Sequence, residues 1–77
     1  MDKETAKTRK KLKQIGSVYD FENILEQSML SEEDKTILRM HYKEQKPLCY
    51  IADELGMSEI TVKKKHRKML MKIGKLF

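Results

Sequence analysis

The sequence has few of the residues that cross-link, rigidify or anchor a small protein. Its 77 residues include one cysteine (Cys49), one proline, three glycines and no tryptophan. A single cysteine cannot form an internal disulfide, and a free thiol suits a reducing compartment. No apolar run is long enough to span a bilayer or to act as a signal peptide. We therefore expect a cytoplasmic protein with no membrane partner.

The motifs of enzymes and metal sites are also missing. The sequence has no glycine-rich phosphate loop, no His-Glu zinc motif and no nucleophile elbow. His41 and His66 fall on different predicted helices, and together with one cysteine they do not match a metal-ligand spacing. A chain of this length is one domain at most, and it buries only about 60% of the surface that its unfolded form exposes. We expect no enzymatic activity, no cofactor and no metal.

The charged residues are unevenly distributed along the chain. The formal net charge is +5, made up of +4 over residues 1–17, −3 over residues 18–47 and +4 over residues 48–77. A net positive charge favours an anionic partner, which is nucleic acid, a membrane surface or an acidic protein. The segregation places the positive charge at the two ends of the chain, on either side of an acidic middle.

The spacing of apolar residues predicts an all-α domain over residues 17–77, a small bundle of four to five helices. Ser17 and Ser31 are suitable N-caps, and the acidic residues after them suit the positive end of a helix dipole. The side chains expected to face the core are Val18, Phe21, Ile24, Leu25 and Met29 in the first helix and Ile37, Leu38 and Tyr42, flanked by Met40, in the second.

The ends and the outer faces of these two helices can also be read from the sequence. The first helix carries acidic residues on its outer face, which we expect to be solvated or, alternatively, to meet a protein partner (Asp20, Glu22 and Glu26). The second helix should end near Glu44 or Gln45. Pro47 supplies no amide proton and fixes its own φ, so it suits the start of the next helix.

Residues 48–73 carry the most informative pattern. Before Gly56, one helical face is apolar, with Leu48, Ile51, Ala52 and Leu55. Gly56 suits the positive φ that closes a helix, and Ser58 can cap the next one. The inward face of that next helix consists of Val62, His66, Met69 and Ile73, and most of its other residues are Lys or Arg. A short helix, a tight turn and a basic second helix indicate a helix-turn-helix, whose second helix enters the DNA major groove.

Candidates for base contact lie near the N-terminal end of the second helix, the end that goes deepest into the groove. With Val62 pointing inward, the outward residues there are Glu59, Ile60, Lys63 and Lys64. Either lysine can donate to guanine O6 and N7, and Ile60 can contact a thymine methyl group. Glu59 can accept from a cytosine amino group or orient a lysine.

Candidates for phosphate contact lie around these residues. Phosphate contacts fix position and make affinity depend on salt, without reading sequence. They are Ser58 and Thr61 at the start of the second helix and Arg67, Lys68 and Lys72 further along it. His66 is either a half-buried histidine or a further residue that reaches a phosphate. The alternative for the lysines is a solubilising face on an ordinary three-helix domain.

The two ends of the chain have weaker patterns. Residues 1–16 are basic and offer only Ala6, Leu12 and Ile15 as apolar contacts, so we expect a frayed helix or a mobile arm. This arm either adds phosphate contacts or is a solvated tail. Leu76 and Phe77 are expected to fold back onto the core or fray, with a small self-association patch as the alternative.

A set of features occurs in a fixed order along residues 30–73. They are Leu30-Ser31 followed by acids, Ile37-Leu38-Arg39-Met40 with Tyr42, Ile51-Ala52 with Leu55-Gly56, Ser58, Thr61-Val62-Lys63, and a basic helix closing on Ile73. This stretch resembles the fourth conserved region of bacterial sigma factors, their promoter-binding C-terminal domain. It is also similar to small helix-turn-helix regulators of that superfamily found on phages and mobile elements.

The resemblance implies that the last long helix reads the upstream promoter element through Glu59, Ile60, Lys63 and Lys64. It further implies that the start of the preceding helix approaches phosphates, at Leu48, Cys49 and Tyr50. RNA polymerase is the implied protein partner. The chain has no room for the domain that melts promoters, so we do not expect a complete sigma factor.

The sequence departs from the family pattern at a few positions. Glu59 and Ile60 stand where the family often has a basic and then an acidic residue, so the promoter preference would differ. Lys65 replaces a residue that is frequently apolar, and Glu33 stands where primary sigma factors carry a basic phosphate contact.

We therefore expect a sequence-specific binder of double-stranded DNA that regulates transcription in the nucleoid, as a monomer or a homodimer. One alternative is a protein-interaction module that binds RNA polymerase or a sigma factor, with incidental DNA affinity. The other is a DNA-handling protein that serves excision or packaging in a mobile element.

Overall fold

The computed structural model describes residues 3–76, and every element in that range is helical. The elements are α1 (Lys3–Gln14), α2 (Val18–Gln27), α3 (Glu32–Leu38), the π-helical segment η1 (Arg39–Lys43), α4 (Leu48–Leu55) and α5 (Glu59–Gly74). No strand occurs within residues 3–76. The prediction of an all-α fold with a C-terminal helix-turn-helix is confirmed.

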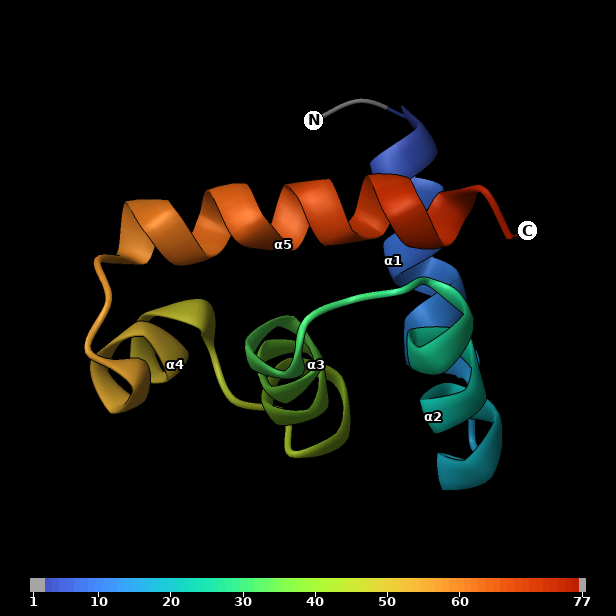
Figure 1. Cartoon of the computed structure of the whole chain (residues 1–77), viewed down its shortest axis with the longest axis horizontal. Coiled ribbons are helices and arrows are strands. Elements are labelled where there is room, and N and C mark those ends of the chain that lie inside the picture. Colours follow the sequence, from blue (N-terminus) through green and yellow to red (C-terminus); the bar gives the residue numbers. More distant parts are fainter. Residues whose placement is uncertain (1–2, 77) are drawn as a thin grey trace.

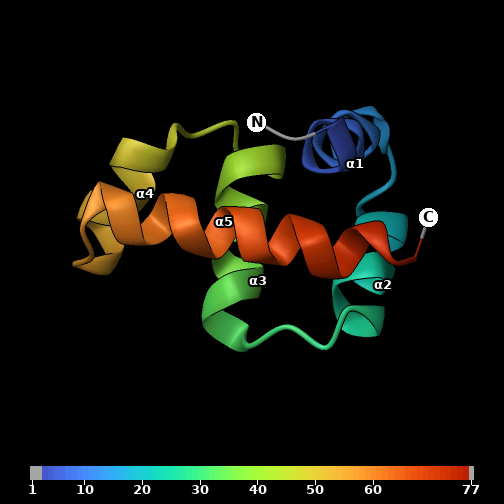
Figure 2. The ribbon, with the colours of Figure 1, turned by 90° about the horizontal axis from the view of Figure 1, so that it is seen from above.

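The longest helix, α5, is the element around which the others are arranged. In Figure 1 it runs along the top of the molecule, with α3 and α4 below it and α1 and α2 near its C-terminal end. Figure 2, seen from above, shows α5 crossing α3, with α4 near its N-terminal end. Because α5 packs against α1, α3 and α4, three helices hold its orientation.

A single apolar core joins the five α-helices. Its buried side chains are Leu12, Phe21, Leu25, Leu30, Ile37, Leu38, Ile51, Ala52, Val62, Met69, Leu70 and Ile73. The predicted phase of α5 is confirmed, because Val62 and Ile73 have no exposed surface. Leu70, which the sequence analysis did not place in the core, is buried as well.

Two side chains that were expected in the core lie outside it. Val18 is 64% exposed and Met29 is 87% exposed. Val18 is the first residue of α2 and precedes its first buried residue, Phe21, by about one turn. Met29 lies beyond the end of α2 with φ +54°, so it no longer follows the phase of that helix. Leu30, the next residue, is buried instead.

The break between η1 and α4 lies where the sequence predicts it. Glu44 caps η1, Gln45 has φ +58°, and α4 follows directly after its N-cap, Pro47. A positive φ at a residue other than glycine turns the chain sharply. The chain therefore leaves η1 and starts α4 within four residues.

The acidic face of α2 is not simply solvated, because two of its carboxylates join α2 to the next helices. Glu22 accepts hydrogen bonds from the Nε and Nη2 atoms of Arg39, the shortest at 2.6 Å. Glu26 accepts from the Nζ atom of Lys35 at 2.6 Å. The hydrogen bonds from Arg39 hold the pKa of the Glu22 carboxyl below its ordinary value. These ion pairs fix α2, which lies outside the helix-turn-helix, to α3 and η1.

The N-terminal segment is a docked helix over Lys3–Gln14, which differs from the frayed helix or mobile arm expected for residues 1–16. Residues 1–2 of that expected arm, and Phe77 at the other end, lie outside the described residues. The sequence offered too few apolar residues, but two threonines complete the buried stripe, so that Thr5, Thr8 and Leu12 are 2%, 5% and 1% exposed. Gly74 permits this contact, because a Cβ there would lie 2.9 Å from Thr8 Oγ1.

Candidate nucleic-acid interface

The turn between α4 and α5 has the geometry that the sequence predicts. Gly56 closes α4 with φ +68° and ψ +32°, in the left-handed region. The amide of Met57 donates to the carbonyl of Ala52 at 2.9 Å, which satisfies one of the last carbonyls of the helix. Ser58 then caps α5 by accepting a hydrogen bond from the amide of Thr61 at 3.1 Å. This turn fixes the direction in which the N-terminal end of α5 points.

The four residues predicted to contact bases are all exposed at that end of α5. Val62, on the opposite face of the helix, is fully buried, whereas Ile60 is 68% exposed. The side chains of Glu59 and Lys63 are 49% and 61% exposed, and they form an ion pair at 3.3 Å. Lys64 is exposed too. None of the four is buried against the acidic helices, so this end of α5 is accessible to a polyanion.

The predicted phosphate contacts at the start of α4 surround an uncapped helix end. Pro47 is the N-cap of α4 and supplies no side-chain hydrogen bond to the first turn. Free amides at such an end favour an anion. Cys49 is exposed, and Tyr50 is 42% exposed with the Nζ atom of Lys46 5.1 Å from its ring centroid. Leu48 is half-buried and faces α5 across a cleft.

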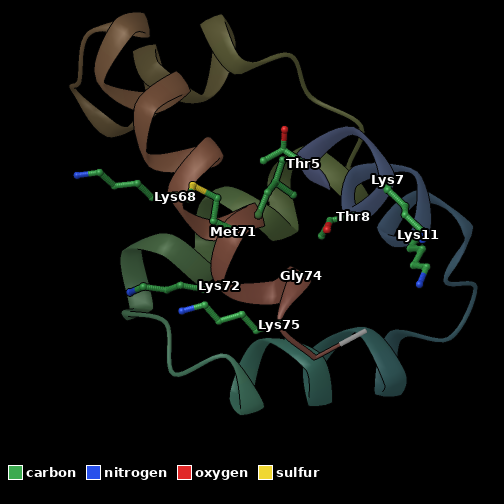
Figure 3. Close-up of a pocket in the computed structure, with 10 residues that line it drawn as sticks. Thr5, Lys7, Thr8, Lys11, Lys68, Met71, Lys72, Gly74 and Lys75 are labelled. Carbon is green, nitrogen blue, oxygen red and sulfur yellow. The ribbon is translucent and has the colours of Figure 1, made fainter. Parts of the chain in front are cut away.

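The predicted phosphate contacts on α5 are exposed but do not share one face. Ser58 and Thr61 lie at its start, where their hydroxyls are 2.8 Å apart. Arg67 lines a cleft together with Lys63 and residues of α1. Lys68 and Lys72 line a different groove, which Figure 3 shows between α1 and the C-terminal half of α5. The structure therefore divides these cations between two surfaces.

The two departures from the family pattern at residues 33 and 65 are paired with each other. The Nζ atom of Lys65 lies 3.1 Å from the Oε1 atom of Glu33. The ion pair joins the first turn of α3 to the middle of α5. Both groups are thus engaged within the protein.

His66 is a buried residue of the core side of α5. It is 7% exposed, and its Nε2 atom lies 2.7 Å from the hydroxyl oxygen of Tyr42. Burial, with the nearby charges of His41 and Arg9, lowers the pKa of His66 to about 4. The same burial raises the pKa of the Tyr42 hydroxyl. His66 is therefore neutral near pH 7 and belongs to the core, which leaves the alternative of a phosphate contact without support.

The sequence analysis did not identify the residues of α1 that approach this surface. A cleft of about 610 Å³ lies between α1, the start of α4 and α5. Four cationic side chains line it, two from each of two helices: Arg9, Lys13, Lys63 and Arg67. The spacing of four residues within each pair was the available signal, because it places both members on one helical face. What the sequence could not supply was the docking of α1 beside α5.

Residues 3–76 contain neither a cluster of metal ligands nor a helix that could span a membrane. No group of three or more His, Cys, Asp or Glu side chains in that range could hold a metal ion. No helix in the same range is long and apolar enough to cross a membrane.

Comparison with known proteins identifies the family of this domain. The family model for sigma-70, region 4 matches residues 28–75, which is more than half of the chain and includes α3, η1, α4 and α5. Neither the comparison with curated proteins nor the comparison with solved structures gives a match. The matched segment contains the exposed end of α5 and the turn that supports it, and both α1 and α2 precede it. The chain belongs to the sigma-70 region 4 family of DNA-binding helix-turn-helix domains.

Proposed function

We propose that this protein is a sequence-specific regulator of transcription that binds duplex DNA with α5 in the major groove. The observation that carries the proposal is the exposure of Glu59, Ile60, Lys63 and Lys64 at the capped N-terminal end of α5. The opposite face of that end rests on Val62, which is fully buried. A basic helix held rigidly by its own core can enter a groove without first becoming ordered.

The dimensions of α5 suit this arrangement. The major groove of B-DNA is about 12 Å wide and about 8.5 Å deep. Residues 60 and 64 are one turn apart, about 6 Å along the helix axis, so both can reach base edges in the same groove. Lys72 stands about 20 Å from the start of α5 and lies beyond the depth of the groove.

The four exposed side chains have distinct roles in this proposal. Lys64 donates to guanine and Ile60 contacts a thymine methyl group. Glu59 and Lys63 form an exposed ion pair, and such pairs are worth only about 0–1 kcal/mol. Either member can therefore exchange its partner for a base or a phosphate at small cost.

The finer parts of the proposal concern partners. Membership of the region 4 family supports RNA polymerase as the protein partner, in the nucleoid of a bacterial or phage-infected cell. The protein would then act as a regulator, with α4 and α5 on the promoter. Contacts to phosphate come from the uncapped start of α4 and from Ser58, Thr61 and Arg67.

Binding of labelled duplex DNA at several salt concentrations tests the proposal. The preferred site is first obtained by selection from a random duplex library. The logarithm of the affinity should fall linearly with that of the salt concentration, by about 0.9 for each phosphate neutralised. Lys64→Ala should lose about 1–3 kcal/mol of discrimination between the selected site and mixed sequence. Lys10→Ala, which removes an exposed lysine of α1, is the matched control and should keep that discrimination.

One outcome would contradict the proposal outright. An affinity for every duplex weaker than about 10⁻⁴ M at moderate salt is below ordinary non-specific binding. The interaction module would then be the better account. One observation favours it, since Val18, Tyr19 and Met29 are exposed apolar side chains on and just after α2. In that case purified RNA polymerase should bind the wild type, and Tyr19→Asp should weaken the complex.

A further inference from the structure

The residues that line the cleft between α1, α4 and α5 include several cations and no acid. Its lining comprises Thr5, Arg9, Lys13, His41, Leu48, Lys63, His66, Arg67 and Leu70. Four of these side chains are cationic at neutral pH and none is acidic. A second hollow next to it adds Lys46 and shares Lys13 and His41 with it. Five cations from α1, α5 and the segment before α4 therefore surround one concave surface.

The packing of α1 places its two cations there. Thr5, Thr8 and Leu12 are buried, and Arg9 and Lys13 follow Thr5 and Thr8 around one flank of the same helix. Arg9 is also close enough to His66 for its positive charge to help lower the pKa of that histidine. Arg9 therefore lines the cleft on the side of α1 and lies near His66 of α5.

We propose that this cleft binds the sugar–phosphate backbone of the same duplex whose major groove receives α5. The inference rests on the proposed function and extends it to α1, which lies outside the segment that the region 4 family matches. In this arrangement α1 is a fixed part of the DNA-binding surface. Arg9 and Lys13 are its phosphate contacts.

The cleft lies next to the exposed N-terminal end of α5, and this position supports DNA as its ligand. Lys63 belongs to the exposed end of α5 and also lines the cleft. Leu48, at the uncapped start of α4, forms another part of the lining. A DNA strand that borders the major groove and passes the start of α4 would therefore come close to Lys63 and Arg67. Further along, the same strand would come close to Arg9 and Lys13. Two of these groups are guanidinium groups, whose planar donors suit the bidentate binding of phosphate.

The groove in Figure 3 provides a contrast on the other flank of α1. Lys7 and Lys11 lie on one side of it, and Lys68, Lys72 and Lys75 lie on the other. It is also rich in lysine, but it sits at the C-terminal half of α5. That end stands about 20 Å from the tip of the helix and so lies off a duplex that holds the tip in its groove. If only net charge mattered, removing cations from either surface would weaken DNA binding equally. If the cleft contacts the DNA backbone, removing the cations of the cleft would weaken binding more.

The experiment compares two double variants of the full chain with equal loss of charge. The cleft variant, Arg9→Ala with Lys13→Ala, removes the two cations that α1 contributes to the cleft. The control variant, Lys7→Ala with Lys10→Ala, removes two cations from other positions of α1. Binding to a labelled mixed-sequence duplex and to the selected site is measured over a series of salt concentrations. Circular dichroism and thermal melting check that each variant folds. Lys13→Glu, at an exposed position, is a second variant that disturbs packing least.

The expected result separates contact from charge. The slope of the logarithm of affinity against the logarithm of salt concentration (the salt slope) should be smaller by about 1.8 in the cleft variant, because two phosphate contacts are lost. At about 0.1 M salt this variant should bind both duplexes at least about tenfold more weakly than the wild type. Its discrimination between the two duplexes should not change, because phosphate contacts carry no sequence information. The control variant should lose less than half as much slope, since charges beyond about 10 Å are screened.

Four results would overturn the inference. Equal losses in both double variants would mean that only net charge matters. A wild-type slope in the cleft variant would mean that α1 does not touch the duplex, while the proposed function would stand. Polyglutamate is titrated in the same salt series; if the cleft variant binds it more weakly than the wild type but keeps its affinity for DNA, the cleft would be assigned to an acidic protein segment. If the wild type shows no salt-dependent DNA binding at all, the proposed function fails first and this inference with it.

Discussion

The buried histidine predicts how the stability of the domain depends on pH. His66 is 7% exposed and its pKa is about 4 in the folded protein, compared with 6.5 for an unperturbed histidine. The unfolded chain therefore takes up a proton on His66 at a higher pH than the folded chain does. Protonation favours the unfolded state, so stability falls as the pH drops through 6.5 and levels off below about 4.

The size of this effect follows from the two pKa values. At about pH 5 the histidine is almost fully protonated in the unfolded chain and almost fully neutral in the folded one. This difference lowers the free energy of unfolding by about 2 kcal/mol relative to neutral pH. That is a large share of the stability of a small domain. The variant His66→Gln keeps a polar partner for the hydroxyl of Tyr42 but does not titrate.

Urea unfolding at about pH 7.5 and about pH 5 measures the difference. Wild type should lose about 2 kcal/mol more than His66→Gln between these two conditions. Comparison with the variant cancels the contribution of carboxylates such as Glu22, whose lowered pKa also costs stability in acid. Identical pH profiles for the two proteins, or a resonance assigned to His66 that titrates near 6.5, would refute the reasoning.

Two other predictions concern the packing of α5. Val62→Asp places a charge at a fully buried position between α4 and α5, so the domain should unfold or lose about 3–5 kcal/mol, measured by circular dichroism; melting like wild type would show that the helix phase is wrong. Gly74→Ala should destabilise the contact of α5 with Thr8 by about 1–3 kcal/mol, and less in a Thr8→Ala background that removes the 2.9 Å clash; an equal effect in both backgrounds would show that the contact is unimportant.

Much of the local structure could be predicted from the sequence, because it depends on interactions over a few residues. Each serine cap accepts a hydrogen bond from an amide three residues on, in all three helices where it was expected. Gly56 adopts the positive φ that its residue type favours. The spacing from Val62 to Ile73 predicts the buried face of α5, since the helix period alone determines it. The exposed candidates for base contact follow from that same phase.

Other features depend on which helices pack against each other, and no local pattern in the sequence indicates those pairings. The sequence analysis could not dock α1, because the docking relies on two threonines and on the missing side chain of Gly74. The ion pair of Lys65 with Glu33 joins residues 32 positions apart, and each residue alone looked like a departure from the family pattern.

The sequence by itself determined the helices, their caps and the outward face of the basic helix, because these depend on hydrogen bonds and periodicity within a few turns. Only the tertiary structure decided which cations stand together. Arg9 and Arg67 are 58 positions apart in the chain, and they line one cleft because α1 packs across α5. Contacts between such distant residues depend on the shapes of both surfaces at once, which no local pattern encodes.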